Sequence, residues 1–485
     1  MARNPFDRPS SRRSDGYAWW FSGDSFSREA QEERMPRKRG IVYRISSHPG
    51  QLTIIYFMSL IFIATSLLLT PAASSSGKST PFSTAFFTAV SALSTCGISI
   101  VNTTQHWSIF GQIVLIVAVQ MGGLGVMTFA SMIALAVNHH LKATQRLLTA
   151  TELGTNKLNE IRSVLNVVLT ITFSIEAITF VSLFPGLLSV NKSNVGKSLW
   201  EALFFAVMAY NNAGFTPDGA GLYVDKWEVG MPIMLSAFCG TLGFPVILNL
   251  VRTARQHKGV RRLNLHTKVT LLTTFIIVLI SLFWFLIVEW NNQALFHNAG
   301  IEERMRRGVV AAVMPRSSGF DLSWVPKVSE PTKVFMSMVM FIGGGSTSTA
   351  GGIRVTTLAV IFLVCKTAFS GHADVNVFHR RIHMRVVMTA ISITVSCLAL
   401  VFVASVSLMM IEDVSFSHAL FDACSAFGLG GYSVGVADAD YPAALYVLAA
   451  TMIIGRLGPM TIAYAVGRPH VVDAVRYPTD QIVVG

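Results

Sequence analysis

The sequence predicts an all-α polytopic membrane protein in which four tandem helix–pore loop–helix repeats, with eight transmembrane helices in total, surround a pseudo-four-fold pore. Composition is the first observation behind this prediction. The 485 residues have a mean hydropathy of +0.53 and only 13% charged residues, whereas soluble globular proteins carry about 25%. The second observation is internal repetition, because one short glycine-containing phrase occurs four times.

The repeated phrase combines a run of small residues with a lone glycine, which an apolar or aromatic residue follows. The four glycines, Gly97, Gly214, Gly319 and Gly431, are separated by 117, 105 and 112 residues. Self-similarity at a nearly constant period indicates one structural unit repeated along the chain. The copies read SALSTCGIS (91–99), MAYNNAGFT (208–216), VMPRSSGFD (313–321) and AFGLGGYSV (426–434).

Eight apolar segments are each long enough to cross a hydrocarbon core of about 30 Å. A large soluble core is the alternative explanation, but it would need far more polar surface than this composition provides. We therefore expect transmembrane helices at residues 52–69, 109–137, 164–188, 231–251, 269–288, 334–369, 386–411 and 443–466.

In each predicted repeat, a stretch too short to span the membrane lies between two long helices and ends at the glycine phrase. Non-helical backbone at membrane depth is tolerated only where protein or a water-filled cavity surrounds it, so the four phrases should face one another. The short stretches are residues 82–95, 198–212, 303–317 and 417–429. We expect a basic, mostly disordered tail at 1–48, then repeats at 49–140, 141–255, 256–372 and 373–485, the last with a C-terminal tail.

Positive charge is distributed unevenly around the predicted spans. The formal net charge is +12, and ten Lys or Arg residues precede residue 49. The loops after spans two, four and six are also basic, whereas the opposite loops are poorer in Lys and Arg, with Arg304, Arg306 and Arg307 as the exception. Cytoplasmic loops carry this excess. We therefore expect a multi-pass protein of the plasma membrane with both termini in the cytoplasm, and no nucleic-acid partner.

The lone glycine of each phrase suggests a bend that turns carbonyl oxygens inward, because glycine adopts positive φ at little cost. Rings of such oxygens replace the hydration shell of a small cation. The short helices would also direct their partially negative C-terminal ends at the cavity, which favours cations. We predict a filter that binds a small monovalent cation through Thr95, Cys96, Gly97, Asn212, Ala213, Gly214, Ser317, Ser318, Gly319, Leu429, Gly430 and Gly431.

A run of ten small residues interrupts the sixth apolar span and predicts a break in the helix, because each glycine costs up to about 1 kcal/mol relative to alanine. We interpret this run as a flexible gate beneath the carbonyl ring. It consists of Gly343, Gly344, Gly345, Ser346, Thr347, Ser348, Thr349, Ala350, Gly351 and Gly352. Arg456 in the eighth span is expected to belong to the gate and to project into the pore, with an ion pair to Asp422 or Glu201 as the alternative.

Two further arginines and several acids lie near these motifs. Arg354 is expected to anchor the gate from the cytoplasmic side or to extend towards lipid headgroups. Arg316 is expected to bond the backbone behind the third loop or a nearby carboxylate. The acids Glu176, Glu201, Glu289 and Asp422 are expected to act as helix caps or ion-pair partners rather than as ion ligands.

Five motifs in this order resemble the Trk/Ktr/HKT superfamily of potassium transporters. They are STCGIS, YNNAGFT, RSSGF, GGGSTSTAGGIRVTT and IGRLGPMT, and the similarity covers about residues 41–485. The ending RYPTDQIVVG resembles that of the Ktr membrane subunit. The family often has Thr where this chain has Ser317 and Leu429, which weakens the expectation of stringent selectivity.

The resemblance implies potassium uptake in a bacterium, through a pore whose gate is the run at residues 343–352 together with Arg456. It also implies a homodimer of pore subunits, docked on a cytosolic ring of nucleotide-binding regulatory subunits. The chain shows no convincing nucleotide motif of its own, and we expect it to bind no cofactor. Sodium is expected to stimulate transport or to permeate as well.

Three other functions remain as alternatives. The first is a less selective Na⁺/K⁺ channel or symporter of the same fold. The second is a transporter with inverted repeats, which the uniform direction of the four repeats disfavours. The third is a membrane enzyme, which would need clustered His, Asp or Glu in the spans. The five cysteines form no CxxC pattern and are expected to be packing residues.

Overall fold

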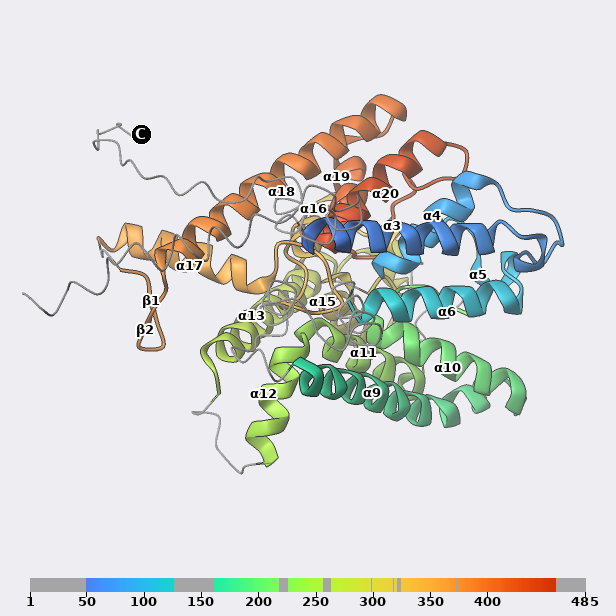
Figure 1. The fold of residues 1–485 in the computed structure, drawn as a ribbon, viewed down its shortest axis with the longest axis horizontal. Coiled ribbons are helices and arrows are strands. Elements are labelled where there is room, and N and C mark those ends of the chain that lie inside the picture. Colours follow the sequence, from blue (N-terminus) through green and yellow to red (C-terminus); the bar gives the residue numbers. More distant parts are fainter. Residues whose placement is uncertain are drawn as a thin grey trace, which may run out of the picture. The chain divides into compact units, whose positions relative to one another are not determined.

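The computed structural model describes residues 49–125, 161–217, 226–255, 263–297, 299–316, 318–320, 324–371 and 374–458. The predicted N-terminal tail, the residues after Gly458 and Ser317 of the predicted filter lie outside the described residues. Over the described ranges, the protein consists of α-helices with one two-stranded hairpin (Figure 1). The prediction of an all-α protein is therefore confirmed in its main feature, and the pseudo-four-fold arrangement of eight helices remains a prediction.

The first half of the described chain contains two groups of helices, and the middle helix of each group ends at one of the repeated phrases. The elements are α3 (Pro49–Leu68), η2 (Pro71–Ala73), α4 (Phe82–Ser94), α5 (Thr103–His106), α6 (Ile109–Gly123), α9 (Ile161–Val190), α10 (Val195–Asn211), α11 (Trp227–Leu242) and α12 (Phe244–Arg255). The side-chain oxygens of Ser108 and Asn194 accept backbone N–H groups of the first turn. These N-caps fix where α6 and α10 begin.

The second half repeats this order and adds a hairpin. Its elements are α13 (Leu265–Val288), α14 (Gln293–Phe296), α15 (Ile301–Val313), η5 (Met314–Arg316), η6 (Val325–Lys327), α16 (Glu330–Ile342), α17 (Val355–Phe369), β1 (Asn376–Val377), β2 (Arg380–Arg381), α18 (Met384–Ile411), α19 (Phe416–Gly428) and α20 (Pro442–Leu457). The strands β1 and β2 pair antiparallel. Proline in the first turn of α16 and α20 suits a helix start, where its missing N–H has no intrahelical partner.

The short helices α4, α10, α15 and α19 lie inside the bundle. The helices α4, α10 and α19 pack against the helices before and after them, and α15 packs against α13. Three of the short helices also pack against the helix that follows the preceding short helix: α10 on α6, α15 on α11 and α19 on α16. The last described helix, α20, packs against α4, so the fourth group of helices contacts the first. The chain therefore surrounds its own centre with these four short helices.

Three described helices are long and apolar enough to cross a membrane: Asn166–Val190, Leu265–Val288 and Met384–Ile411. The pair α11 and α12 qualifies as a fourth span only as a bent one, because the two helices meet at 101°. The sequence predicted residues 231–251 as one continuous span, and this prediction was wrong. The predicted break in the sixth span is present, since residues 343–354 separate α16 from α17.

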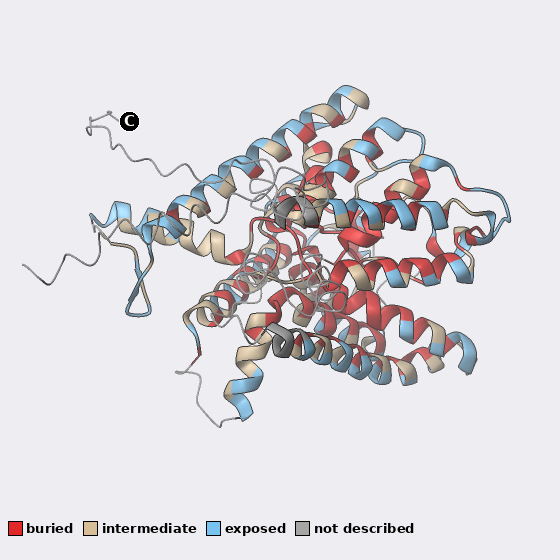
Figure 2. Ribbon diagram, viewed as in Figure 1, coloured by how far each residue is buried: buried red, intermediate tan, exposed pale blue. Residues whose placement is uncertain are grey.

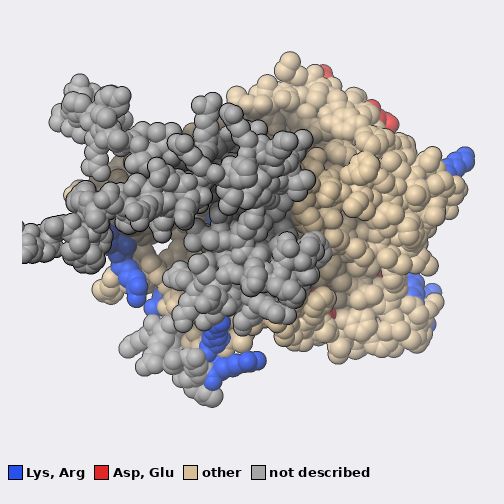
Figure 3. Space-filling model, viewed as in Figure 1, with Lys and Arg blue, Asp and Glu red and all other residues tan. Residues whose placement is uncertain are grey.

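Burial is inverted relative to a soluble protein, because large apolar side chains cover the outside of the long helices. Phe62, Ile287 and Met410 are 74%, 75% and 83% exposed, while ten of the thirteen residues of α4 are buried. Figure 2 shows buried residues gathered in the middle of the described fold. Figure 3 shows a broad uncharged surface with Lys and Arg mainly towards its ends. This distribution fits a protein whose outer surface faces lipid.

Candidate functional site

Three of the four short helices end in the same backbone conformation. Thr95, Asn212 and Leu429 follow α4, α10 and α19 with left-handed φ values of 57°, 59° and 56°. This C-terminal cap reverses the chain and satisfies carbonyls of the last turn. The closing bonds are 2.9 Å from Cys96 N to Ser91 O, 2.9 Å from Ala213 N to Met208 O and 2.7 Å from Gly430 N to Ser425 O. In the third group, the 3₁₀ turn η5 follows α15 instead.

The four glycines of the repeated phrase lie against one another. A methyl group placed on Gly97 would lie 2.0 Å from the backbone nitrogen of Gly214, and one on Gly214 would lie 2.8 Å from the carbonyl carbon of Gly319. One on Gly319 would lie 2.5 Å from the Cα of Gly431, and one on Gly431 would lie 2.6 Å from the carbonyl oxygen of Cys96. The contacts follow chain order and return to the first loop, so the four loops form a closed ring of backbone, which we call the glycine ring.

The ring has no room for side chains, and the flanking residues point theirs into the protein. Thr95, Cys96, Asn212, Ala213 and Leu429 are fully buried. At Gly97 a φ of 85° adds a conformational reason for glycine. Gly214 has no positive φ, and close backbone approach alone explains it there. Ser318, Gly319, Gly430 and Gly431 belong to the same assembly.

The polar groups closest to the ring belong to backbone. The ends of α4, α10 and α19 adjoin it directly, and these C-terminal ends carry partial negative charge. No cluster of three or more His, Cys, Asp or Glu side chains occurs among the described residues. The atoms nearest to the four ring glycines are therefore backbone nitrogens, carbons and carbonyl oxygens.

The Gly-rich run lies directly against the ends of the short helices. The backbone nitrogens of Gly345 and Gly351 donate to the carbonyls of Thr241 and Gly428 at 2.8 and 3.2 Å. A methyl group on Gly351 would lie 2.7 Å from the Cγ of Leu429, which follows α19. The run, which the sequence predicted to be a gate, therefore contacts the second and fourth groups next to the ring.

Thr349 is the point at which the run and the ring connect. Its carbonyl oxygen accepts from the Oγ1 of Thr95 at 3.0 Å and from the Nη1 of Arg456 at 2.6 Å. Its Oγ1 accepts from the Nδ2 of Asn212 at 2.6 Å. The Oγ of Ser318 in turn donates to the Oδ1 of Asn212 at 2.7 Å. Residues of the predicted filter, the Gly-rich run and Arg456 therefore meet at Thr349.

Arg456 and Arg354 both bond the Gly-rich run. Arg456 is 9% exposed and also donates to the carbonyl of Gly122, while the expected ion-pair partners Asp422 and Glu201 bond other groups. Arg354 donates to Ser348 Oγ and Gly345 O at 3.1 and 3.2 Å, and to Ala350 O. Of the two alternatives for Arg354, the structure shows the bonds to the run, and the cytoplasmic side of this contact remains a prediction.

Arg316 does not make the contact that the sequence suggested. Its side chain is 1% exposed, and none of its three guanidinium nitrogens has a hydrogen-bond partner among the described residues. The expected bond to backbone behind the third loop is therefore not found there. Ser317, the next residue, lies outside the described part of the chain.

The four buried acids accept hydrogen bonds within the fold, and among the described residues the expected ion pair is found for Glu201, with Lys197 at 3.4 Å. Asp422 accepts from Ser433 Oγ at 2.6 Å and from the nitrogens of Val434 and Ala437, so it orders the chain beyond the fourth loop. The remaining acids have these partners: Glu176 accepts from Asn211 at 3.2 Å, Glu201 from Asn191 at 2.5 Å and Glu289 from the backbone nitrogen of Ser329 at 3.1 Å.

Glu289 lies just beyond α13 and holds the start of α16. Burial alone would raise the pKa of this carboxyl. Hydrogen bonds from the side chains of Ser329, Thr332 and Asn292 and from the Ser329 backbone outweigh that effect and lower the pKa below its ordinary value. The hydrogen bonds in the folded protein therefore stabilise the charged form of the Glu289 carboxyl.

The sequence analysis missed the breaks that follow the other glycine motifs. Gly125, Gly243 and Gly458 have φ values of 85°, 88° and 77°, and α6, α11 and α20 end just before them. The available signal was the pattern Gly-x-Leu-Gly, which reads GGLG, GTLG and GRLG. Its first glycine packs on a short helix, since a methyl group on Gly122 or Gly240 would lie 2.0 Å from a carbonyl oxygen at the helix end.

Comparisons with known proteins agree with this architecture. The profile of the TrkH family, described as cation transport protein, matches residues 31–471. Ktr system potassium uptake protein B of Bacillus subtilis is 30% identical over 451 residues, covering 93% of this chain and 99% of the relative. The protein of the same name from Vibrio alginolyticus is 31% identical over 457 residues, covering 92% and 99%.

Two further similarities extend this picture. Potassium/sodium uptake protein NtpJ of Enterococcus hirae is 29% identical over 456 residues, covering 92% of this chain and 99% of the relative. The crystal structure of the potassium transporter TrkH from Vibrio parahaemolyticus matches with a TM-score of 0.67 at 15% identity, covering 85% of this chain and 83% of that one. At this identity the structural match supports the fold alone.

Proposed function

The chain belongs to the TrkH family of cation transport proteins, and from this premise we propose that it takes up potassium through the glycine ring, with the Gly-rich run as its gate. The family transports cations and is not a family of enzymes, in agreement with the sequence analysis. The observation that carries the proposal is the closed backbone contact among Gly97, Gly214, Gly319 and Gly431. Four loops from distant parts of the chain meet where carbonyl oxygens can replace the water around a K⁺ ion.

Uptake needs no chemistry from this chain. A membrane potential of 100 mV is worth about 2.3 kcal/mol per elementary charge, which is enough to concentrate a monovalent cation about fiftyfold. The C-terminal ends of the short helices lower the cost of a cation at the ring. Conduction then requires that the run at residues 343–352 move, because Thr349 bonds both the ring and Arg456.

The charge distribution supports a cytoplasmic position for the end of the fold that contains α12 and the β1–β2 hairpin. Arg252 and Arg255 end α12, and Arg380, Arg381 and Arg385 lie at the hairpin and the start of α18. Under the positive-inside rule this end faces the cytoplasm. The glycine ring would then open to the outside, with both termini inside. A homodimer and a cytosolic nucleotide-binding ring are the partners that the resemblance implies.

The test is rescue of a bacterium that lacks its own potassium uptake. Wild-type protein, expressed with a cognate regulatory subunit, should restore growth at low potassium, and Gly97→Ser should abolish growth or relax selectivity. Gly77→Ser is the matched control, because Gly77 also has a positive φ of 69° but nothing lies within 4 Å of an added methyl group. Failure of wild-type protein to rescue, or equal loss in both variants, would refute the pore.

The gate is tested separately. Shortening the run at residues 343–352 removes contacts to Thr241 and Gly428. Potassium flux should rise and depend less on the regulatory subunit. Loss of flux in a folded variant would show that the run is not the barrier.

A less selective Na⁺/K⁺ pathway is the second candidate. The single glycine shared by all four loops favours it, because fewer carbonyl layers discriminate less between the two ions. The similarity to a potassium/sodium uptake protein points the same way. Flux of each ion into vesicles, measured at equal concentrations, decides between the candidates.

A further inference from the structure

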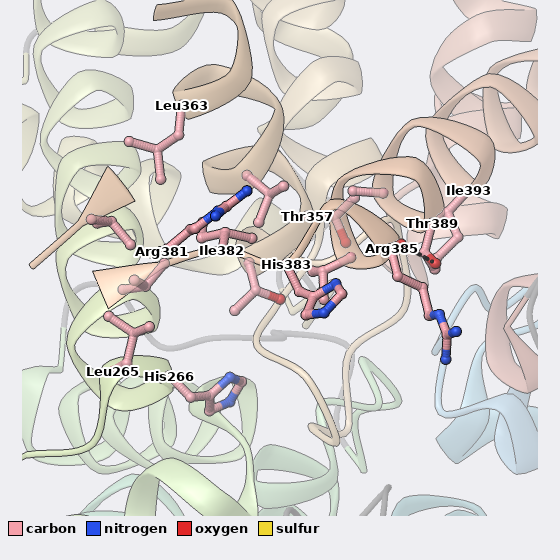
Figure 4. Close-up of a pocket in the computed structure, with 16 residues that line it drawn as sticks. Leu265, His266, Thr357, Leu363, Arg381, Ile382, His383, Arg385, Thr389 and Ile393 are labelled. Carbon is pink, nitrogen blue, oxygen red and sulfur yellow. Dashed lines mark hydrogen bonds between the residues drawn. The ribbon is translucent and has the colours of Figure 1, made fainter. Parts of the chain in front are cut away.

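A cavity of about 650 Å³ lies between the first turn of α13, the N-terminal parts of α17 and α18, and the β1–β2 hairpin. Figure 4 shows the side chains that line it, which come from all four of these elements. The cavity is separate from the glycine ring, and neither the transport proposal nor the family similarity assigns it a role.

The cavity has one apolar wall and one cationic edge. Val269 of α13, Leu363 of α17 and Ile393 of α18 form part of the apolar wall and are half-buried. Arg381 and Arg385 are exposed at the edge. An apolar wall next to concentrated positive charge is complementary to a molecule that has both a hydrocarbon part and an anionic part.

The charge of this edge is only partly compensated within the chain. Arg381 pairs with Asp374, whose carboxylate oxygen lies 2.8 Å from its Nη2, and both side chains remain exposed at 71% and 43%. Arg385 has no ion-pair partner within 4 Å among the described residues. His383, also at the edge, adds a further hydrogen-bond donor or acceptor. The edge therefore keeps a net positive charge towards its surroundings.

The surroundings of the cavity are apolar and exposed. Phe362 and Phe369 of α17 are 69% and 92% exposed, and Met384 and Met388 of α18 are 62% and 56% exposed. Both α13 and α18 are long enough to span a membrane, and the cavity lies at their N-terminal parts. The cationic edge thus lies where a membrane-spanning helix leaves the hydrocarbon region, at the depth of the headgroups.

We infer that this cavity binds an anionic phospholipid of the cytoplasmic leaflet. Its phosphate lies against Arg381 and Arg385, and part of an acyl chain lies along the apolar wall of α13, α17 and α18. A free phosphate ion would use the edge and leave the apolar wall without a function. A lipid uses both, and anionic lipids are concentrated at the leaflet where positive-inside charge also accumulates.

The site also contacts the proposed gate. Thr356 lines the cavity, and its hydroxyl shares a hydrogen bond of 3.0 Å with the hydroxyl of Ser346 in the Gly-rich run. The helix α17 begins at Val355, directly after this run. A lipid bound against α17 therefore restricts the movement of the end of the run. This part of the inference rests on the proposed function.

Binding is tested without any transport measurement, by native mass spectrometry of the full chain titrated with phosphatidylglycerol. The wild-type protein should retain phosphatidylglycerol in preference to phosphatidylcholine. The double variant Arg381→Ala/Arg385→Ala should lose roughly tenfold or more in apparent affinity for phosphatidylglycerol. The control Arg252→Ala/Arg255→Ala removes two exposed cations from the end of α12, and it should bind like the wild type.

Two further arms identify the source of the anionic group. Thr389→Phe, which places a ring in the apolar part of the cavity, should weaken lipid retention although every cation remains. Soluble glycerol phosphate should not compete. Equal lipid retention in the wild type and the double variant, or full competition by glycerol phosphate, would overturn the lipid site. A change in the number of chains per assembly without a change in lipid retention would also overturn it, because the cavity would then be a contact between two copies.

The link to the gate is tested by potassium flux into vesicles with and without phosphatidylglycerol. Flux through the wild type should depend on this lipid, and flux through the double variant should not. A double variant that no longer retains phosphatidylglycerol but keeps the wild-type dependence would refute the link while leaving the lipid site intact. Absence of flux from the wild type in every lipid would instead count against the transport proposal.

Discussion

Loops two and four share one backbone conformation but hold the Gly-rich run in different ways. Asn212 and Leu429 occupy the same place after a short helix, with φ values of 59° and 56°. Asn212 donates to Thr349 at 2.6 Å and accepts from Ser318 at 2.7 Å. Leu429 instead packs its side chain against Gly351. The comparison teaches that backbone forms the ring, while the side chains behind it determine how the ring connects to the gate.

The largest effect is expected where the two loops are equivalent. Alanine at Gly214 would place a methyl group 2.7 Å from the carbonyl oxygen of Ser318, and alanine at Gly431 would place one 2.6 Å from that of Cys96. Both substitutions should reduce potassium uptake in a complementation assay to background, because no backbone atom can move aside cheaply.

The control for that prediction is Gly435→Ala, close to the fourth loop. Gly435 has a φ of 107° but nothing within 4 Å of an added methyl group. The variant therefore tests the effect of backbone strain in the absence of a steric clash. It should retain uptake. If Gly431→Ala transported normally while Gly214→Ala did not, the two loops would not be equivalent, and the closed ring would be the wrong description.

A smaller effect is expected where the loops differ. Asn212→Leu makes loop two resemble loop four and leaves the buried hydroxyl of Ser318 without its acceptor. It also removes the donor to the hydroxyl of Thr349, which keeps its 3.5 Å bond to the carbonyl of Tyr210. Each unsatisfied group costs about 1–3 kcal/mol, so the melting temperature should fall clearly. Potassium flux should depend less on the regulatory subunit, because the run loses a bond to the ring. Leu429→Met, a volume-conserving change, should leave both properties nearly unchanged. Similar behaviour of the two variants would remove the distinction between the loops.

A double-mutant cycle sharpens the same point. Thr349→Val keeps the shape of the side chain but removes the hydroxyl that accepts from Asn212. Alone it should destabilise the protein by about 1–3 kcal/mol, since the Asn212 amide loses a buried partner. Combined with Asn212→Leu it should cost less than the sum, because the Asn212 amide that Thr349→Val leaves unpaired is then absent, while the loss of the Ser318 acceptor is the same with or without Thr349→Val. Additive costs, measured by thermal unfolding in detergent, would mean that this bond does not couple ring and run.

The glycine ring could be predicted from the sequence because the residues that form it occur in short, recognisable phrases. The four phrases recur at nearly even spacing, and glycine is required wherever backbones touch, so Gly97 and Gly214 could be assigned from pattern alone. The Gly-rich run was equally visible, because small residues in a row cannot sustain a helix. The bonds from Arg354 to this run were one of the two alternatives expected for that residue.

What the sequence could not supply were contacts between distant segments. Nothing local indicates that Thr349 receives bonds from residues 254 and 137 positions away. The bend of 101° between α11 and α12 was also missed, because hydropathy averages over a window and ignores a single glycine at positive φ. Arg316 was expected to bond backbone behind the third loop or a nearby carboxylate, and its guanidinium nitrogens have neither partner among the described residues, because sequence does not reveal the partner of a buried charge.

The smallest effect is expected for Glu289→Gln. This variant tests whether a loss of thermal stability is enough to remove the dependence of flux on the regulatory subunit. Glu289 joins α13 to α16 outside both loops, and hydrogen bonds lower its pKa below the ordinary value of 4.5. A carboxyl with a depressed pKa stabilises the folded state fully above its unfolded pKa, and this contribution is lost as pH falls through the folded value. Between pH 6 and pH 3.5 the wild type should therefore lose more thermal stability than Glu289→Gln.

At neutral pH, Glu289→Gln should have a lower melting temperature than the wild type and keep the dependence of flux on the regulatory subunit. If it instead lost that dependence as Asn212→Leu does, then loss of regulation would follow from any weakening of the fold, and the contrast between loops two and four would say nothing specific about the gate.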